Sequence, residues 1–278
     1  MRVVLAGASG QIGSALSSAL RARGDEPLAL PRFGRAPWSA EGADAVVNLA
    51  GASVAGKRWS PAYKKEILDS RVLTTRALVD AIASAQRKPR VLVNASAVGY
   101  YGGRGDEVLE ESAGPGADFL ADVSQHWEAE AQKAPVRSVQ IRTGVVLSKT
   151  GGALASMLPP FKAFVGGPVG SGRQWFPWIH LDDEVAGILW CIDHDSLRGP
   201  VNFVAPGIVT MKDFARALGR ALHRPSWAPV PAGALKILLG EFAAALLEGQ
   251  RAVPKKLLES GFRFRFPEVD SALADVLG

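Results

Sequence analysis

Three glycines near the start of the chain have the spacing of a phosphate-binding turn. Gly7, Gly10 and Gly13 follow an apolar run at residues 3–5, and a helical pattern begins at Gln11. Each place requires a glycine: the first makes the sharp turn from a strand, the second lets the backbone approach a pyrophosphate, and the third lets a helix pack close to the sheet. The helix N-terminus would then offer free N–H groups to the phosphates. The alternative is a strand–turn–helix whose glycines only relieve crowding.

The residue after the second expected strand discriminates between two dinucleotides. An acidic side chain there accepts hydrogen bonds from the ribose 2′-hydroxyl of NAD, whereas an arginine accommodates the 2′-phosphate of NADP. Arg32 follows the expected strand at residues 27–30, with Arg35 close behind and no acidic residue before Glu41. Because a guanidinium pairs well with a phosphate, Arg32 favours NADP over NAD. A solvated surface arginine is the alternative.

Strand and helix patterns alternate through the first half of the chain. Strands are expected at residues 2–6, 27–30, 44–49, 90–94 and 137–142, and helices at 11–23, 60–85 and 118–133. Ser60 and Pro61 favour the start of the long helix, because serine is a good N-cap and proline is tolerated at the first helical position. The alternation predicts an α/β, Rossmann-type fold with a doubly wound parallel sheet that binds ligands at the carboxyl ends of its strands.

The regular alternation of strand and helix patterns ends after residue 147. Helices are expected at 152–164, 183–192, 211–222 and 233–247, a short helix at the C-terminus, and short strands at 178–181 and 201–204. We therefore expect a dinucleotide-binding domain at residues 1–150, with its sheet completed by parts of 176–205. A smaller substrate-side lobe would occupy residues 151–278 and include a helical segment at 229–278.

Composition restricts the class of protein. The chain is 47% hydrophobic and 21% charged, which is typical of a soluble globular protein. The net charge of +5 is scattered, so it suits phosphorylated ligands better than nucleic acid. Cys191 is the single cysteine, which predicts a reducing compartment, the cytoplasm. The histidines lack metal-ligand spacing, and neither a signal peptide nor a membrane span is expected.

Several further segments carry a family resemblance. They are residues 48–51 (NLAG), 57–59 (KRW), 69–72 (DSRV), 96–102 (SAVGYYG), 142–147 (RTGVVL), 170–175 (GSGRQW), 178–183 (WIHLDD), 231–241 (PAGALKILLGE) and 254–267 (PKKLLESGFRFRFP). Together they resemble the short-chain dehydrogenase/reductase superfamily in its extended branch, and more narrowly its atypical, NAD-dependent epimerase/dehydratase-like "epimerase family" group with that group's C-terminal domain. The resemblance covers essentially the whole chain.

The resemblance implies a cofactor cradle for NADP. It assigns Gly7, Ser9, Gly10, Gln11 and Ile12 to the pyrophosphate, Arg32 to the adenine ribose, and Leu49, Ala50 and Gly51 to the path between adenine and ribose. Ser96 and the segment at residues 142–145, with Arg142, Gly144 and Val145, would lie near the nicotinamide.

One departure concerns the catalytic pair of the superfamily. Active members use a Tyr as general acid/base and a Lys that lowers its pKa, in the pattern Y-x-x-x-K. The tyrosines here are at positions 63, 100 and 101, so none lies on the helix that should carry the pair. Alignment instead places Leu120 at the Tyr position and Ser124 at the Lys position, with Glu128 supporting the register.

Other residues would have to carry any catalysis. Ser96 keeps the place of the superfamily's hydroxyl residue, although counting from Tyr101 would select Ala97 instead. Tyr100 or Tyr101 would serve as the substitute acid, or both pack the loop after the strand.

Basic and aromatic residues mark the expected substrate side. Arg71 replaces the asparagine usual on the central helix, so it would anchor a substrate anion, bind a cofactor phosphate or pair with a carboxylate on a helix. Lys57, Arg58, Arg173 and Trp175 are the other candidates, with surface solvation or core packing as the alternative.

Two functions therefore remain open. The first is an NADP-dependent oxidoreductase or epimerase acting on a small polar substrate. The second is a non-catalytic NADP-binding regulatory protein, which has a basis in relatives linked to cell or plastid division. Besides a small-molecule substrate, a homodimer through the helices at residues 60–85 and 118–133 is common in the superfamily.

Overall fold

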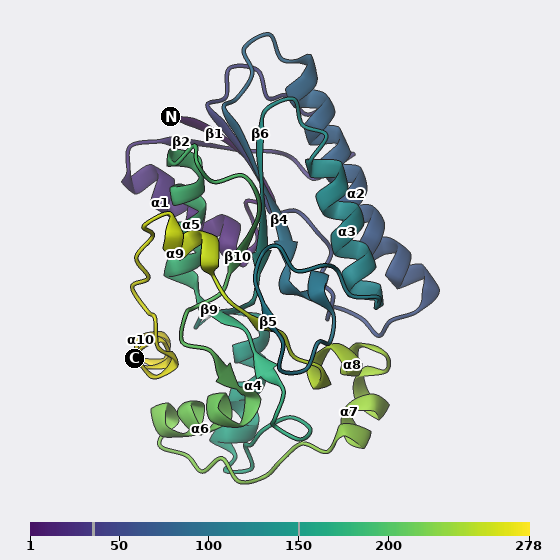
Figure 1. Ribbon diagram of the computed structural model, residues 1–278, viewed down its shortest axis with the longest axis vertical. Coiled ribbons are helices and arrows are strands. Elements are labelled where there is room, and N and C mark those ends of the chain that lie inside the picture. The colour runs from purple at the N-terminus through teal and green to yellow at the C-terminus, as the bar shows by residue number, and fades with distance from the viewer. Residues whose placement is uncertain (35–36, 150) are drawn as a thin grey trace.

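A six-stranded parallel sheet forms the centre of the computed structural model, which describes residues 1–34, 37–149 and 151–278 (Figure 1). In spatial order its strands are β10 (Gly199–Phe203), β6 (Arg137–Thr143), β4 (Val91–Ala97), β3 (Ala45–Asn48), β1 (Arg2–Ala6) and β2 (Glu26–Ala29). Every residue of β3 is buried, as expected for a strand covered on both faces. The expected doubly wound Rossmann-type sheet is confirmed.

Helices cover both faces of this sheet. α1 (Gln11–Ala22) and α5 (Leu181–Asp193) lie on one face, and α2 (Pro61–Ser84) and α3 (Phe119–Ala131) lie on the other (Figure 1). Successive side chains of a strand point to opposite faces, so Val3 and Leu5 join the core beneath α1 and α5, whereas Val4 and Ala6 join the core beneath α2. Ser60 caps α2 as expected, since its hydroxyl accepts a hydrogen bond from the backbone N–H of Tyr63.

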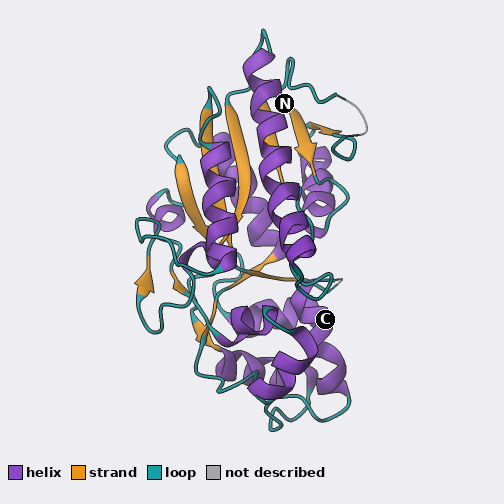
Figure 2. Cartoon of the chain, turned by 90° about the vertical axis from the view of Figure 1, so that its right-hand side faces the viewer, coloured by secondary structure: helices purple, strands orange, loops and turns teal. Residues whose placement is uncertain are grey.

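A lobe with its own core lies below the carboxyl ends of the strands (Figure 2). Its main helices are α4 (Gly152–Lys162), α6 (Met211–Leu222) and α10 (Val269–Leu277). The remaining elements are η1 (Val98–Tyr101), β5 (Val108–Leu109), β7 (Val145–Leu147), β8 (Trp175–Phe176), β9 (Trp178–His180), β11 (Val209–Thr210), α7 (Ala232–Leu239), α8 (Phe242–Leu247), β12 (Arg251–Ala252) and α9 (Lys255–Glu259). None of the described helices is both long and apolar enough to cross a membrane.

The prediction of one helix at residues 233–247 is wrong. The segment divides into α7 and α8, with Gly240 between them at a φ of +63°. Glycine adopts this backbone conformation without steric cost and commonly ends a helix. The break turns α8 toward the carboxyl edge of the main sheet.

The start of α5 also differs from the expected one. The helix begins at Leu181, and His180 caps it through Nδ1, which accepts a hydrogen bond of 3.0 Å from the backbone N–H of Asp182. The buried Asp183 carboxylate accepts hydrogen bonds from the backbone N–H groups of Arg265 and Phe266. It therefore fastens the C-terminal segment to the start of α5.

Candidate functional site

The turn between β1 and α1 leaves backbone N–H groups open at the start of a helix. Gly7 has a φ of +81°, and a Cβ there would lie 2.7 Å from the carbonyl carbon of Leu49. A Cβ on Gly13 would lie 2.2 Å from the Gly7 oxygen. Gly10 is the N-cap and supplies no side chain, and the first turn of α1 contains no acidic residue. The turn is therefore free to receive an anion.

The residues expected at the pyrophosphate surround this turn. Ser9 is exposed, whereas Gln11 and Ile12 are half-buried. The Gln11 amide nitrogen is buried and has no hydrogen-bond partner in the part of the chain that the structure describes. An unsatisfied buried donor is costly unless a ligand accepts from it. This chemistry fits a nucleotide phosphate in the cradle.

Two neighbouring loops border the turn. β1 lies between β2 and β3, so the loops after β2 and β3 flank the loop after β1 at one edge of the sheet. Arg32 is exposed on the first of these loops, while Arg35 lies outside the described residues. Leu49, Ala50 and Gly51 form the second loop, where the Leu49 N–H donates to the Ala6 carbonyl at 2.9 Å. The structure thus brings the predicted cofactor residues to one edge.

A cavity of about 360 Å³ lies at this edge, a size that is typical of small-molecule sites. Apolar side chains from α2, α3, α8 and their flanking loops form most of its wall: Val54, Trp59, Phe119, Leu120, Val123, Trp127, Phe242 and Leu246. Its polar lining residues are Arg71, Ser96, Asp118, Ser124, Glu241, Glu248 and Gln250. Leu120 and Ser124 both face the cavity, and the Ser124 hydroxyl donates within α3 to the Leu120 carbonyl at 2.8 Å.

Arg71 enters the cavity from α2 and connects it to the cradle. Its Nη1 donates to the carbonyls of Ala52 and Ile67, both at 3.0 Å. Its Cζ lies 4.9 Å from the centre of the Trp127 ring, and a Cβ on Gly51 would lie 3.1 Å from that Cζ. No carboxylate of the described chain forms an ion pair with this guanidinium. Burial lowers the pKa of Arg71 to about 10, so the side chain is charged at neutral pH.

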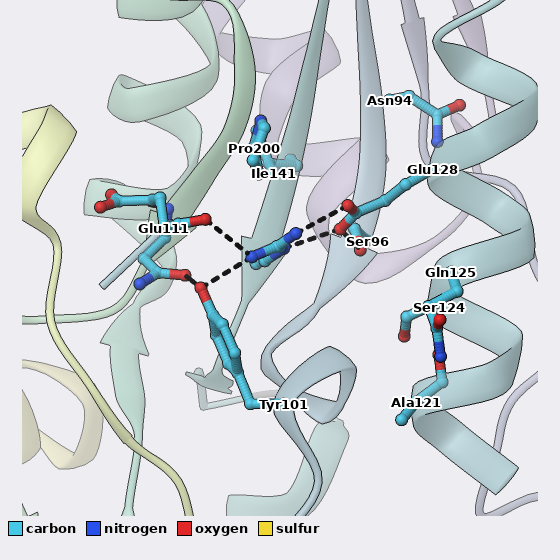
Figure 3. Close-up of polar contacts among 12 residues, drawn as sticks. Asn94, Ser96, Tyr101, Glu111, Ala121, Ser124, Gln125, Glu128, Ile141 and Pro200 are labelled. Carbon is cyan, nitrogen blue, oxygen red and sulfur yellow. Dashed lines mark hydrogen bonds and ion pairs between the residues drawn. The ribbon is translucent and has the colours of Figure 1, made fainter. Parts of the chain in front are cut away.

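Arg142 is buried, and each of its three nitrogens donates a hydrogen bond; dashed lines mark contacts with Tyr101, Glu111 and Glu128 in Figure 3. Glu128 of α3 accepts two hydrogen bonds from its Nε and Nη2, at 2.8 and 2.9 Å. The Tyr101 hydroxyl and the Glu111 carbonyl accept from its Nη1, at 2.9 and 3.2 Å. Ser96 donates to the same Glu128 at 2.6 Å. Burial alone would lower the pKa of Arg142, but Glu128 raises it above its ordinary value.

The two tyrosine candidates lie away from the cavity. Tyr101 is fully buried, and its hydroxyl donates to Asn202 at 2.7 Å. Burial raises the pKa of the Tyr101 phenol, with Arg142 acting in the opposite direction. Tyr100 is half-buried and packs its ring on the Arg142 guanidinium, with 3.4 Å between Cζ and the ring centre. Only Ser96 of the three predicted catalytic residues lines the cavity.

The other predicted residues also lie outside the cavity. Lys57 and Arg58 are exposed on the loop before α2, and Lys57 forms an ion pair with Glu66 of that helix. Arg173 and Trp175 line a separate hollow of about 490 Å³. The backbone N–H groups of Gly144 and Val145 donate to the carbonyls of Phe203 and Pro177, at 3.0 and 2.7 Å. These two residues link the sheet to the lobe.

Sequence reasoning missed the aromatic wall of the cavity. The ring of Trp59 lies 5.0 Å from that of Phe119 and 5.5 Å from that of Phe242. The tryptophan was noted only within a family segment, because no local spacing relates these three positions.

Glu184 was also missed. It is fully buried on α5, where one carboxyl oxygen accepts from the Thr143 hydroxyl at 2.8 Å and the other has no partner among the described residues. Burial raises its pKa to about 8. No cluster of described His, Cys, Asp and Glu residues could hold a metal ion.

Comparison with known proteins gives consistent matches. The NAD dependent epimerase/dehydratase family matches residues 3–204, and a domain of unknown function, DUF1731, matches residues 230–276. An epimerase family protein SDR39U1 homolog of Arabidopsis thaliana, described as chloroplastic, is 48% identical over 241 residues, covering 85% of this chain and 69% of that protein. An epimerase family protein of Mycobacterium leprae is 42% identical over 293 residues, covering 98% and 94%.

A solved structure resembles the whole chain. The crystal structure of human epimerase family protein SDR39U1 (isoform 2) with NADPH has a TM-score of 0.95 and 35% sequence identity. The match covers 100% of this chain and 99% of the human one. The similarity therefore extends over both the sheet and the lobe.

Proposed function

The chain belongs to the NAD-dependent epimerase/dehydratase family, as an atypical short-chain dehydrogenase/reductase, and from this premise we propose that it is an NADP(H)-dependent oxidoreductase for a small molecule. NADP(H) is its cofactor. The open turn at Gly7–Gly13, the orphaned Gln11 amide and Arg32 fit a phosphorylated dinucleotide, and the similar human protein was crystallised with NADPH. When bound, the nicotinamide supplies or accepts a hydride.

The observation that carries the proposal is the position of the cavity. It shares Arg71 with the loop at Leu49–Gly51, and it contains Ser96 at the end of β4. The chain can thus bind a small molecule beside the cradle, against aromatic walls. Ser96 places a hydroxyl there, and Arg71 places a positive charge where substrate oxygen can be held.

The geometry favours reduction over epimerisation. Epimerisation through a ketone first requires a base that removes a hydroxyl proton. Leu120 and Ser124 stand where the superfamily has its Tyr and Lys, and both tyrosines of the η1 segment lie outside the cavity. A reduction needs only an electrophilic oxygen-binding group and a proton from solvent, which the open rim of the cavity admits.

A nucleotide titration followed by an isotope-transfer assay tests the proposal. Purified protein is titrated with NADPH, NADP, NADH and NAD, alongside Arg32→Ala. We expect NADPH to bind at least tenfold more tightly than NADH and Arg32→Ala to lose most of that preference. Protein loaded with NADPH deuterated at C4 is then given small aldehydes, ketones and conjugated acids, and products are examined for deuterium.

Leu120 and Ser124, which take the places of the superfamily's Tyr and Lys, also support a second function. Because neither Leu120 nor Ser124 carries a general acid or base that titrates near neutral pH, the chain would also suit a non-catalytic NADP-binding regulator. Tight NADPH binding without deuterium transfer to any compound would favour this alternative and contradict the oxidoreductase. Absence of affinity for every pyridine nucleotide would contradict both.

We further propose the setting in which the protein works. The partner is a small-molecule substrate, with no nucleic acid and no membrane involved, and the buried free Cys191 suits the reducing cytoplasm. A homodimer through α2 and α3 is proposed by analogy with the superfamily. Light scattering on the purified protein measures this directly, since a monomeric mass at micromolar concentration contradicts the dimer.

A further inference from the structure

We propose that the cavity binds a small monocarboxylic acid with a flat apolar body, and that Arg71 receives its carboxylate. The inference rests on the proposed function, whose substrate class it names. It depends on what the guanidinium of Arg71 does with its donors, on the walls around it, and on the charges at the mouth of the cavity.

Arg71 retains an unused pair of donors. A guanidinium has five N–H groups in a rigid plane, and the two carbonyl bonds of Arg71 both come from Nη1. The Nε and Nη2 groups have no partner among the described residues. They form one edge of the plane, and this edge matches the two oxygens of a carboxylate in a bidentate pair.

The same group is half-buried without a compensating charge. Desolvation lowers its pKa, and no described carboxylate forms an ion pair with it. A cation that is partly removed from water without a counter-charge is destabilising, so its retention is explained if a ligand supplies the anion. Its contact with the Trp127 ring offsets part of the cost.

The walls set the shape of the ligand body. Trp59, Phe119 and Phe242 pack with tilted or edge-to-face rings, and Leu120 and Leu246 complete an apolar surface. A flat apolar group can pack against this aromatic surface. A volume of about 360 Å³ admits a molecule of the size of cinnamate.

The mouth of the cavity is acidic, and this excludes a larger class of ligand. Asp118, Glu241 and Glu248 are exposed lining residues, and Glu241 is paired with Lys64, whereas Ser96 is buried and Arg71 half-buried. A Cβ on Gly102 would lie 2.8 Å from a carboxylate oxygen of Asp118. A Cβ on Gly103 would lie 2.5 Å from a carboxylate oxygen of Glu248.

The two carboxylates at the Gly102–Gly103 loop therefore share one rim. A nucleoside diphosphate-sugar would have to bring its two phosphates past this rim. A ligand whose only negative charge points inward avoids that repulsion.

A binding experiment tests the assignment. Protein saturated with NADP is titrated with cinnamate, with the neutral cinnamamide and with UDP-glucose, and tryptophan fluorescence and calorimetry report binding. We expect cinnamate to bind about tenfold more tightly than cinnamamide, and UDP-glucose not to bind. Arg71→Gln should abolish the preference for the acid, and Arg71→Lys should keep part of it, because lysine retains the charge without the planar pair of donors.

Controls separate this proposal from the proposed function. Arg58→Gln removes an exposed arginine outside the cavity and should leave the preference unchanged. NADPH affinity and thermal unfolding are measured for each variant. An acid preference that survives in folded Arg71→Gln overturns the assignment. An Arg71→Gln variant that loses NADPH affinity but still prefers the acid overturns it as well. Arg71-dependent acid binding without deuterium transfer would support the site and contradict the oxidoreductase.

Discussion

Two arginines lie at the carboxyl edge of the same sheet and differ in their surroundings. Arg142 is saturated in the sense that each of its nitrogens donates a hydrogen bond: Glu128 neutralises it and accepts from Nε and Nη2, and the Tyr101 hydroxyl and Glu111 carbonyl accept from Nη1. Arg71 donates from one nitrogen to two carbonyls and has no ion pair among the described residues. The difference teaches that burial alone does not define a ligand site. A ligand site is indicated by hydrogen-bond donors that face a cavity and have no partner in the described chain.

The largest effect is expected from breaking the saturated pair. Glu128→Gln leaves Arg142 buried without its counter-charge, and the free energy of unfolding should fall by about 3–5 kcal/mol. Urea unfolding measures the loss. Glu130→Gln on the same helix is the matched control, because its partners Arg76 and Lys133 are more than half exposed, and its cost should stay near 1 kcal/mol. Equal losses in the two variants would show that the Arg142 cluster has no special role.

Glu184 extends the comparison to a carboxyl without a counter-charge. Its pKa rises from 4.5 in the unfolded chain to about 8 in the folded protein. The unfolded chain therefore loses this proton first, so the stability contribution is full below pH 4.5 and falls as pH rises toward 8, by up to about 1.4 kcal/mol per pH unit. Unfolding by urea at pH 5 and pH 8 should show Glu184→Gln gaining on the wild type at the higher pH. A constant difference would contradict the buried, protonated state.

The sequence predicted the parts of the site that depend on local signals. Glycine spacing indicated the turn after β1, and the bounds of α6 at Met211–Leu222 match the expected ones, because its apolar periodicity is contained in the segment itself. The family resemblance added the place of the missing Tyr and Lys at Leu120 and Ser124.

Tertiary contacts could not be predicted in this way. Arg142 and Glu128 pair because β6 lies under α3, and Phe242 reaches Trp59 because Gly240 redirects the chain more than 100 residues after α3. Neither contact follows from the hydrophobic periodicity of one segment, because the partners lie on different elements. The sequence consequently placed Tyr101 and Arg142 among the residues facing ligand, whereas the structure packs them against each other.

Tyr101→Phe tests whether that hydroxyl belongs to the saturated cluster. The change removes an acceptor for Arg142 and a donor to Asn202, both buried, and should cost about 1–2 kcal/mol of unfolding free energy. NADPH affinity and deuterium transfer should stay at the wild-type level, because the hydroxyl does not line the cavity. Tyr100→Phe is the control, since among the described residues its hydroxyl makes no hydrogen bond to the cluster, and its ring contact with Arg142 is kept. Loss of hydride transfer in Tyr101→Phe without loss of stability would instead make this phenol catalytic.

The smallest expected effect concerns Arg71 itself. Arg71→Met removes a half-buried cation that no described carboxylate neutralises, and it gives up two bonds to the carbonyls of Ala52 and Ile67. These contributions oppose each other, so the free energy of unfolding should change by less than about 1 kcal/mol. Arg142→Met, which strands the buried Glu128, should lose about 3–5 kcal/mol under the same conditions. Similar losses from the two methionine variants would mean that Arg71, like Arg142, is held for the fold. A stable Arg71→Met protein would show that the charge at this position serves binding, because the folded chain does not need it.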